Sequence, residues 1–287
     1  MQLVSRRNLV GNCALAVFAG LHNVKRAIAQ SPRRGGGQTA VLVNHPRGQY
    51  SFLPGVSAYS SGVVARDGYE IVHATFSRLP SLRAGFKAID EHLSGLNLQK
   101  IALCGVELRS PRSLSLKDFS VFNGSYVDVL KSWGLLLDGG VNPVARTNVA
   151  PVVLPPPEPA FYGFSYTVRS TAPQKTFIVA GAGEFGDLSR NPTDIIRRGD
   201  TSSAAIAEKT RYVTDVMGGN LRAMGVNWPD VTTIDFYTAH ELSEAVLVEI
   251  LKLSGHNAVT WNYARPPILE VEIEMDLRGV RREIVLG

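Results

Sequence analysis

The stretch Ser94-Gly95-Leu96-Asn97-Leu98-Gln99-Lys100-Ile101 returns at an offset of 130 residues as Met224-Gly225-Val226-Asn227-Trp228-Pro229-Asp230-Val231. Both stretches contain a glycine, an aliphatic residue and an asparagine, followed by the aliphatic start of a strand. Each glycine is placed where a helix would end on a residue with a left-handed backbone. The repeat predicts two copies of one structural unit.

The residues around each repeated stretch follow the same pattern. Apolar side chains recur at helical spacing before each glycine, and a strand and a second helix are expected after it. Each half then closes with an extended segment. The expected helices are 82–93, 117–133, 206–224 and 241–253, and the expected strands include 101–108, 160–168, 231–237 and 268–277. The chain therefore predicts two tandem β-β-α-β-α-β units.

This order of elements predicts an α+β fold in which the helices of each unit cover one face of its sheet. The opposite face is left uncovered and has to be buried. We therefore expect the two halves to pack on each other or on other chains. The expected domains are residues 38–170 and 171–287.

Length and composition exclude several classes of protein. The 287 residues are 45% apolar, which supports an ordinary core and argues against a disordered, coiled-coil or collagen-like chain. The net charge of +5 is spread along the chain, so no nucleic-acid partner is expected. The two cysteines, Cys13 and Cys104, are too few for a disulfide framework or a zinc site. No apolar run reaches the roughly 18 residues of a membrane span.

The N-terminus has the order of a signal peptide. Arg6 and Arg7 precede a short, weakly apolar stretch, and Ala27-Ile28-Ala29 offers a small-residue cleavage site. Paired arginines in this position are typical of the twin-arginine class, which exports folded proteins. We expect residues 1–29 to be the signal and residues 30–37 a linker, with a periplasmic or secreted location. A plain N-terminal extension of a cytoplasmic protein is the alternative.

The start of the second half contains a sequence that fits a nucleotide-binding fingerprint. Phe177-Ile178-Val179-Ala180 has the composition of a strand, and Gly181-Ala182-Gly183-Glu184-Phe185-Gly186 fits G-x-G-x-x-G. The fingerprint requires a helix to begin within the loop, so that its N-terminus can hold pyrophosphate. The residues that follow, 187–192, show no helical period and end in a proline. We therefore interpret these glycines as those of a β-bulge or hairpin.

Other familiar sites are missing from the sequence. The six histidines include no His-x-x-x-His pair, and none lies near Cys104. Neither a Gly-x-Ser-x-Gly elbow nor a phosphate-binding loop occurs. We expect no metal and no organic cofactor.

Three motifs of the first half occur in a specific order. Gly48-Gln49-Tyr50 precedes a strand, Asp118-Phe119-Ser120-Val121-Phe122-Asn123-Gly124-Ser125-Tyr126 opens the second helix, and Asn142-Pro143-Val144-Ala145-Arg146-Thr147-Asn148-Val149 follows. This order resembles the YjgF/RidA superfamily of imine and enamine deaminases, from about Tyr50 to Val168. A more divergent copy runs from about Lys175 to Arg282. The resemblance implies two tandem chorismate-mutase-like domains, and clefts formed between neighbouring subunits of a trimer.

The resemblance also assigns roles to single residues. It implies that Arg146 grips the substrate carboxylate, for which a guanidinium fork is suited; an exposed ion pair is the alternative. Tyr50 and Asn123 are expected to line the cleft. The family places a glutamate on the final strand to handle the attacking water. Tyr162 stands there in the first half, whereas the second half offers Glu272 as the catalytic group.

The final strand of the second half alternates between acidic and apolar residues. Alternation places Glu270, Glu272, Glu274 and Asp276 on one face, which is either solvated or functional. The position matching Arg146 falls near Asn257 and Ala258, without an arginine. The first half thus supplies an arginine and the second a glutamate, and the resemblance implies a composite site.

These observations predict a hydrolytic deaminase of imine or enamine acids, either 2-aminoacrylate-like or aminomuconate-like, that releases ammonia and an oxo acid. The expected partner is a small carboxylated substrate, and the expected assembly is a homo-oligomer, trimeric or pseudo-trimeric. Two alternatives remain open. One is a chorismatase-like hydrolase of a cyclic unsaturated carboxylate, since Ala264-Arg265 and 269–274 resemble the C-terminal segment of chorismatases. The other is a non-catalytic protein that binds small ligands.

Overall fold

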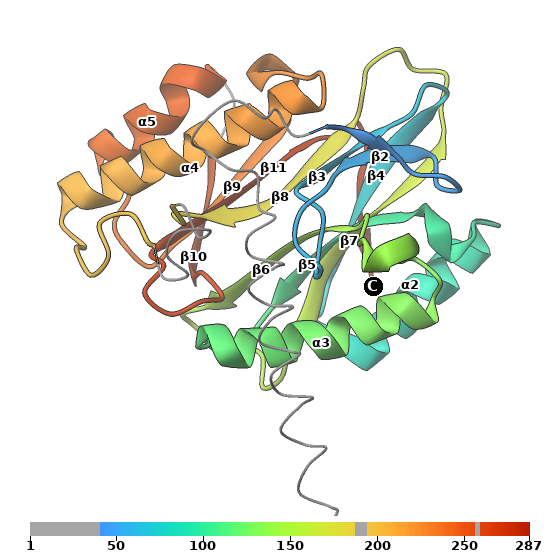
Figure 1. Ribbon diagram of the computed structural model, residues 1–287, viewed down its shortest axis with the longest axis horizontal. Helices are drawn as coiled ribbons and strands as arrows, with labels where there is room; N and C mark the ends of the chain where they lie inside the picture. The colour runs from blue at the N-terminus through green and yellow to red at the C-terminus, as the bar shows by residue number, and fades with distance from the viewer. Residues whose placement is uncertain (1–40, 187–193, 256–258) are drawn as a thin grey trace, which may run out of the picture.

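The computed structural model describes residues 41–186, 194–255 and 259–287, whose strands join into one 12-stranded sheet (Figure 1). The sheet order is β1-β2-β3-β8-β11-β9-β10-β6-β5-β7-β4-β12. The strands of the first half are β1 Val43–Asn44, β2 Tyr50–Leu53, β3 Gly62–Ala65, β4 Tyr69–Phe76, β5 Leu103–Arg109, β6 Ala145–Pro151 and β7 Ala160–Arg169. Those of the second are β8 Phe177–Gly183, β9 Thr233–Thr238, β10 Val259–Arg265, β11 Ile273–Gly279 and β12 Glu283–Leu286. The helices are α2 Leu82–Gly95, α3 Leu116–Ser132, α4 Ser203–Ala223 and α5 Glu244–Ser254.

The repeat is visible in the strand order. In the first half β5 lies between parallel β6 and antiparallel β7, and β4 follows β7. In the second half β9 lies between parallel β10 and antiparallel β11, and β8 follows β11. The two groups of four strands join at β6 and β10, where Ala150 pairs with Arg265. This arrangement confirms the predicted tandem α+β fold.

Strands at both ends of the sheet cross between the halves. Strand β3 of the first half pairs with β8, with Val64 opposite Phe177. Strand β12 of the second half runs parallel to β4, with Ile284 opposite Ala74. Among the described residues of the second half, β8 is the one strand before α4, and its neighbour in the sheet is β3 of the first half. The halves are therefore joined by backbone hydrogen bonds as well as by side-chain packing.

The helices cover the outer faces of the sheet. Figure 1 shows α4 and α5 on one side of the molecule and α2 and α3 on the other, with strands between them. Three of these helices begin after a serine whose hydroxyl accepts a backbone N–H: Ser81 from Ala84, Ser115 from Asp118 and Ser202 from Ala205. Such a cap contributes about 1 kcal/mol and fixes where the helix begins.

The helix-free faces bury each other, as the sequence predicts. Tyr50, Phe52 and Val63 of the first half share one apolar cluster with Ala180 and Val280 of the second. Buried charged residues also occupy this interior, and they include Glu107, Arg109, Asp235, Asp276 and Arg278. The interface between the halves is thus partly apolar and partly ionic.

The two repeated turns differ in detail. Gly225 has the predicted left-handed backbone, with φ of 70°. Gly95 does not: α2 runs through it, and Asn97 takes the left-handed conformation instead, with φ of 55°. The prediction for Gly95 is therefore wrong, because asparagine also tolerates this region and lets α2 continue past the glycine.

The G-x-G-x-x-G sequence forms part of a strand. Gly181 and Gly183 lie in β8, which carries an extra residue opposite β11 between Met275 and Leu277. The sequence predicted a β-bulge or a hairpin for these glycines, and the structure confirms the bulge. Helix α4 begins at Ser203, well after the motif.

The predicted signal peptide and linker, residues 1–37, lie outside the described residues, as does Cys13. Within the described parts of the chain, no helix has the length and apolar character needed to cross a membrane.

Candidate active site

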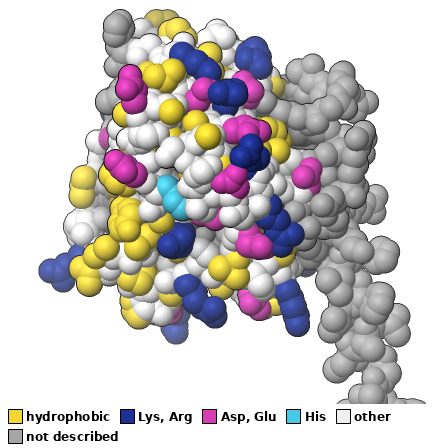
Figure 2. All heavy atoms as spheres, turned by 90° about the vertical axis from the view of Figure 1, so that its left-hand side faces the viewer, with side chains coloured by type: hydrophobic (Ala, Val, Ile, Leu, Met, Phe, Trp, Pro, Cys, Tyr) yellow, Lys and Arg dark blue, Asp and Glu magenta, His cyan; other side chains and the backbone are white. Residues whose placement is uncertain are grey.

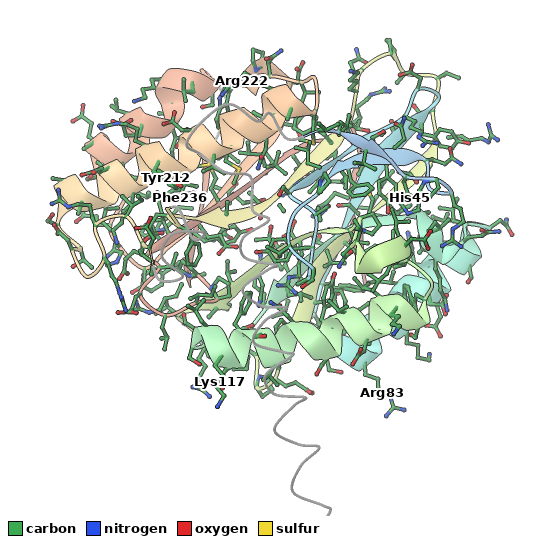
Figure 3. The ribbon with its side chains drawn as sticks, viewed as in Figure 1. His45, Arg83, Lys117, Tyr212, Arg222 and Phe236 are labelled. Atoms are coloured by element: carbon green, nitrogen blue, oxygen red, sulfur yellow. The ribbon has the colours of Figure 1, made fainter. Side chains whose placement is uncertain are left out.

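Arg146 lies in β6 and is buried, with 2% of its surface exposed. Its guanidinium group lies over four rings, which we call the aromatic wall: Tyr59 at 4.7 Å, Tyr126 at 4.9 Å, Phe119 at 5.5 Å and Phe122 at 5.7 Å from the ring centroids. The last three come from α3, where spacings of three, four and seven residues place them on one helix face. By contrast, Arg83 and Lys117 are exposed and point away from the strands (Figure 3). Arg146 is therefore not the exposed ion-pair residue of the alternative.

The hydrogen bonding of Arg146 is incomplete. Nη2 donates to Oδ1 of Asn123 at 2.7 Å, so the structure brings together two of the predicted site residues, Arg146 and Asn123. Nη1 is buried and has no hydrogen-bond partner in the described structure. Burial lowers the pKa of Arg146, while Tyr126, Tyr59 and Glu274 oppose this shift. A buried guanidinium donor without a partner is rare, and it fits a site for an anionic oxygen of a ligand.

Glu274 is the carboxylate that the second half brings to Arg146. It is the second residue of β11 and is 6% exposed. Burial raises the pKa of Glu274 to about 8, Arg146 opposes this rise, and Glu184 adds to it. The backbone of Asn148 in β6 hydrogen bonds to the Glu274 carboxylate. Glu274 is therefore placed between β6 and β11, beside Arg146, with its proton retained at neutral pH.

Glu272 and Tyr50 have other surroundings. The Glu272 carboxylate lies 2.7 Å from Nε2 of His240, and its role in catalysis stays a prediction. Tyr50 is fully buried, and its hydroxyl donates to the Leu103 carbonyl at 3.3 Å within the apolar interior. The tyrosine that contacts Arg146 from the β2–β3 loop is Tyr59. The predicted match to Arg146 at residues 257 and 258 lies outside the described residues.

Comparison with known proteins gives the site a context. The family model described as 2-aminomuconate deaminase CnbZ matches residues 42–284. The chain belongs to this family. It is 37% identical over 243 residues to the 2-amino-5-chloromuconate deaminase of Comamonas testosteroni, a match that covers 83% of this chain and 96% of that protein. The predicted enzyme class, a deaminase, is thereby confirmed.

Several solved structures also match the chain at low sequence identity. The match to a chorismatase covers 81% of this chain and 77% of the chorismatase chain, with 11% identity and a TM-score of 0.46. The YjgF gene product of E. coli covers 37% of this chain and 81% of its own, with 17% identity and a TM-score of 0.27. RidA of an Antarctic Psychrobacter covers 40% of this chain and 88% of its own, with 17% identity and a TM-score of 0.29.

A second group of buried charges lies between the two halves of the deaminase. Nη1 of Arg278 lies 2.5 Å from Asp235 and 3.7 Å from Glu107, and the Tyr237 hydroxyl donates to Asp276 at 3.0 Å. Burial raises the pKa values of Asp235 and Asp276, whereas His73, Arg278 and Arg109 together lower that of Glu107 against the effect of burial. A narrow cavity with room for about one water adjoins this group. Its lining includes Arg146, Thr147, Glu107, Asp276 and Arg278.

The carboxylates of this group have the proximity that a metal site requires. One oxygen each of Glu107, Asp235 and Asp276 lies within 4.8 Å of the others. Arg278 already supplies a positive charge to two of them. We therefore interpret the group as an ionic contact between the halves, in which Oε2 of Glu107 is buried without a hydrogen-bond partner in the described structure.

Glu274 and Tyr59, which both lie near Arg146, received no individual role from the sequence. Glu274 differs from the predicted Glu272 by one alternation of the strand, and the same pattern contained both. Burial distinguishes them: Ile273, Met275 and Leu277 pack into the core beneath α4 and α5, so Glu274 and Asp276 face the other half. Tyr59 comes from a loop, where no periodicity marks a functional side chain.

Proposed function

We propose that this deaminase hydrolyses 2-aminomuconate or a closely related enamino dicarboxylate, and releases ammonia and the 2-oxo acid. The observation that carries the proposal is the buried guanidinium group of Arg146, whose Nη1 lacks a partner, with the buried carboxyl of Glu274 close enough to influence its pKa. Family membership and the 37% identical relative, which is named for such a substrate, support it.

Substrate binding follows from the geometry around Arg146. The carboxylate next to the amino-bearing carbon would accept a hydrogen bond from Nη1, while Asn123 holds Nη2 and thereby fixes the plane of the guanidinium group. The aromatic wall offers flat apolar surfaces to a conjugated chain. The site is buried, and the lower local dielectric strengthens the charge-assisted hydrogen bond.

Glu274 would perform the proton transfers. Its carboxyl first donates a proton to the enamine carbon, which gives a protonated imine. The resulting carboxylate then accepts a proton from the water that attacks the C=N carbon, and a carbinolamine forms. Transfer of that proton to nitrogen releases ammonia as the C–N bond breaks, and the hydroxyl proton returns to Glu274 as the C=O bond forms. The net reaction is enamine plus water to ketone plus ammonia, and Glu274 ends protonated as it began.

Ammonia release by the purified protein tests this proposal. We expect one ammonia for each 2-oxo acid formed from freshly generated 2-aminomuconate, measured against the spontaneous rate in buffer. Chorismate serves as the comparison substrate. Consumption of chorismate without deamination of 2-aminomuconate would favour the chorismatase alternative. Saturable binding of 2-aminomuconate without turnover would favour the non-catalytic alternative.

We also propose that the protein is a homo-oligomer. Strand β10 carries exposed aromatic residues, with Trp261 45% and Tyr263 50% exposed, and Leu269 nearby in the sequence is 53% exposed. Figure 2 shows the face on that side of the molecule, where apolar side chains gather in one part and charges of both signs occupy the rest. Light scattering should give a mass above 31.1 kDa, and Trp261→Glu should lower it. A wild-type mass of one chain at micromolar concentration would contradict the proposal.

A further inference from the structure

The glycine-rich segment Gly181-Ala182-Gly183-Glu184, which resembles a nucleotide fingerprint, has contacts that the proposed mechanism does not use. We infer that this segment is a cradle that positions Glu274, with Gly181 and Glu184 as its positioning residues. The inference rests on the proposed function, since it assigns Glu274 the proton transfers. The inference predicts that a change in this segment lowers kcat only because it moves the Glu274 carboxyl.

Gly181 leaves the space that the Glu274 carboxylate occupies. A Cβ at position 181 would lie 2.3 Å from Oε1 of Glu274, far inside van der Waals contact. The backbone N–H of Gly181 also donates to the hydroxyl of Thr147 at 3.1 Å, which ties β8 to β6. Because β6 carries Arg146, this bond sets the spacing between the arginine and the carboxylate. Glycine is thus required here for close approach of a side chain.

Glu184 holds the residues that lead into β11. Its carboxylate accepts the backbone N–H of Glu272 at 2.7 Å and that of Ile273 at 3.2 Å. Lys209 of α4 donates to the same carboxylate at 3.2 Å, and both side chains are fully buried. These bonds fix the backbone directly before Glu274. A charged pair in the core is costly unless it is hydrogen bonded, and the Glu184 carboxylate accepts three such bonds.

Gly183 allows β11 to lie close to β8. A Cβ there would lie 2.7 Å from the Val271 side chain and 3.2 Å from the Ile273 carbonyl. The bulge in β8 lies opposite Asp276, two residues after Glu274. The two glycines thus lie opposite two successive parts of the chain at β11. Gly181 faces the Glu274 side chain, and Gly183 faces the residues just before Glu274.

The decisive variant is Gly181→Ala. The added methyl would lie 2.3 Å from Oε1 of Glu274 and 3.0 Å from Cγ2 of Thr147, and because the Glu274 side chain is flexible we expect its carboxylate to move most. We expect kcat to fall at least tenfold, with a small change in KM because Arg146 is untouched. Gly95→Ala is the matched control, since nothing lies near its added methyl, and it should leave kcat and KM unchanged and should not lower the unfolding temperature.

The double variant Gly181→Ala with Glu274→Gln separates positioning from a general structural effect. If the glycine acts through Glu274, adding Gly181→Ala to Glu274→Gln causes no further loss of kcat. An equal fall of kcat in both backgrounds would overturn the inference. So would an unchanged kcat in Gly181→Ala alone.

A spectroscopic titration keeps this test separate from the proposed function. The carboxyl band of Glu274, assigned by its loss in Glu274→Gln, should titrate at a different midpoint in Gly181→Ala than in the wild type. Such a shift in a protein that released no ammonia would support the cradle and refute the proposed reaction. An unchanged midpoint in an active enzyme would refute the cradle and leave the reaction standing.

Discussion

Arg146 donates one hydrogen bond from Nη2 to Oδ1 of Asn123 at 2.7 Å, and its Nη1 is buried with no partner among the described residues. This relationship orients the guanidinium group while it leaves one edge unsatisfied. In a buried site a missing partner costs free energy that an anionic ligand recovers. The arrangement therefore resembles a receptor for one carboxylate oxygen.

Replacement of Arg146 by lysine should weaken substrate binding although the charge is kept. Lysine carries a point charge without the planar fork, so it cannot bond Asn123 and the substrate in one plane. We expect KM to rise about 10- to 100-fold, which corresponds to the loss of one charge-assisted bond. Arg83→Lys, at an exposed position in α2, should leave KM unchanged. Steady-state kinetics with equal KM for both variants would contradict the assignment.

Glu274→Gln and Glu272→Gln form a second pair of variants. The amide introduced by Glu274→Gln keeps the shape of the side chain but neither donates nor accepts the proton in the reaction. We expect kcat to fall about 10²- to 10⁴-fold with KM nearly unchanged. Glu272→Gln removes a partner of His240 and should lower kcat by much less. A larger loss in Glu272→Gln would restore Glu272 as the catalytic residue.

The motifs of the first half named both Arg146 and Asn123, whose side chains meet in the structure, while their roles in substrate binding stay predictions. Glu274, which the proposed mechanism uses in place of the predicted Glu272, could not be chosen from the sequence because strand β11 begins only at Ile273. Glu270 has a left-handed backbone with φ of 72°, and Glu184 binds the amides of residues 272 and 273. The sequence pattern shows the alternation. It does not show that the carboxylate of Glu184, 88 residues before Glu272, binds the amides at the start of β11.

The sequence predicted the elements of the fold but not all of their pairings. Helical spacing and the 130-residue repeat gave the helices and central strands, whose patterns are local. The exchange of β3 and β12 between the halves was not predicted. Such pairings join residues far apart in the sequence, and an edge strand carries no mark of the partner it will meet. The predicted domain boundary at residues 170 and 171 therefore describes the repeat, while hydrogen bonds cross it.

The pH dependence of turnover should follow the protonation of Glu274. Burial raises its pKa from the ordinary 4.5 to about 8, so the acid form required for the first proton transfer is present at neutral pH. We expect kcat to be level below pH 8 and to fall above it.

The free energy of unfolding should also fall as pH rises. Between about pH 4.5 and 8 the folded state holds a proton on Glu274 that the unfolded state releases, so unfolding becomes easier at higher pH.

Urea unfolding at several pH values measures the second effect. The fall in the free energy of unfolding across this range should be smaller in Glu274→Gln, which has no proton to release at that position. A kcat that rises through pH 8 would show that the carboxylate form begins the reaction, and would contradict the order of proton transfers proposed above.

The ionic contact between the halves supports a last prediction, for Arg278→Met. Arg278 lies 2.5 Å from Asp235 and 3.7 Å from Glu107, and all three are buried. Removal of the guanidinium group leaves two carboxylates buried without that charge, which should lower the free energy of unfolding by about 3–5 kcal/mol. Arg281→Met, which removes a half-exposed partner of Glu70, should cost about 1 kcal/mol or less.

The pH dependence of this loss identifies its cause. Without Arg278 the buried carboxylates are more costly to ionise, so their pKa values rise and protonation relieves the cost at acid pH. The difference in stability between Arg278→Met and the wild type should therefore shrink as pH falls toward 5 and grow toward pH 8. A difference that stays constant over this range would mean that Arg278 stabilises the interface by packing of its side chain rather than by its charge.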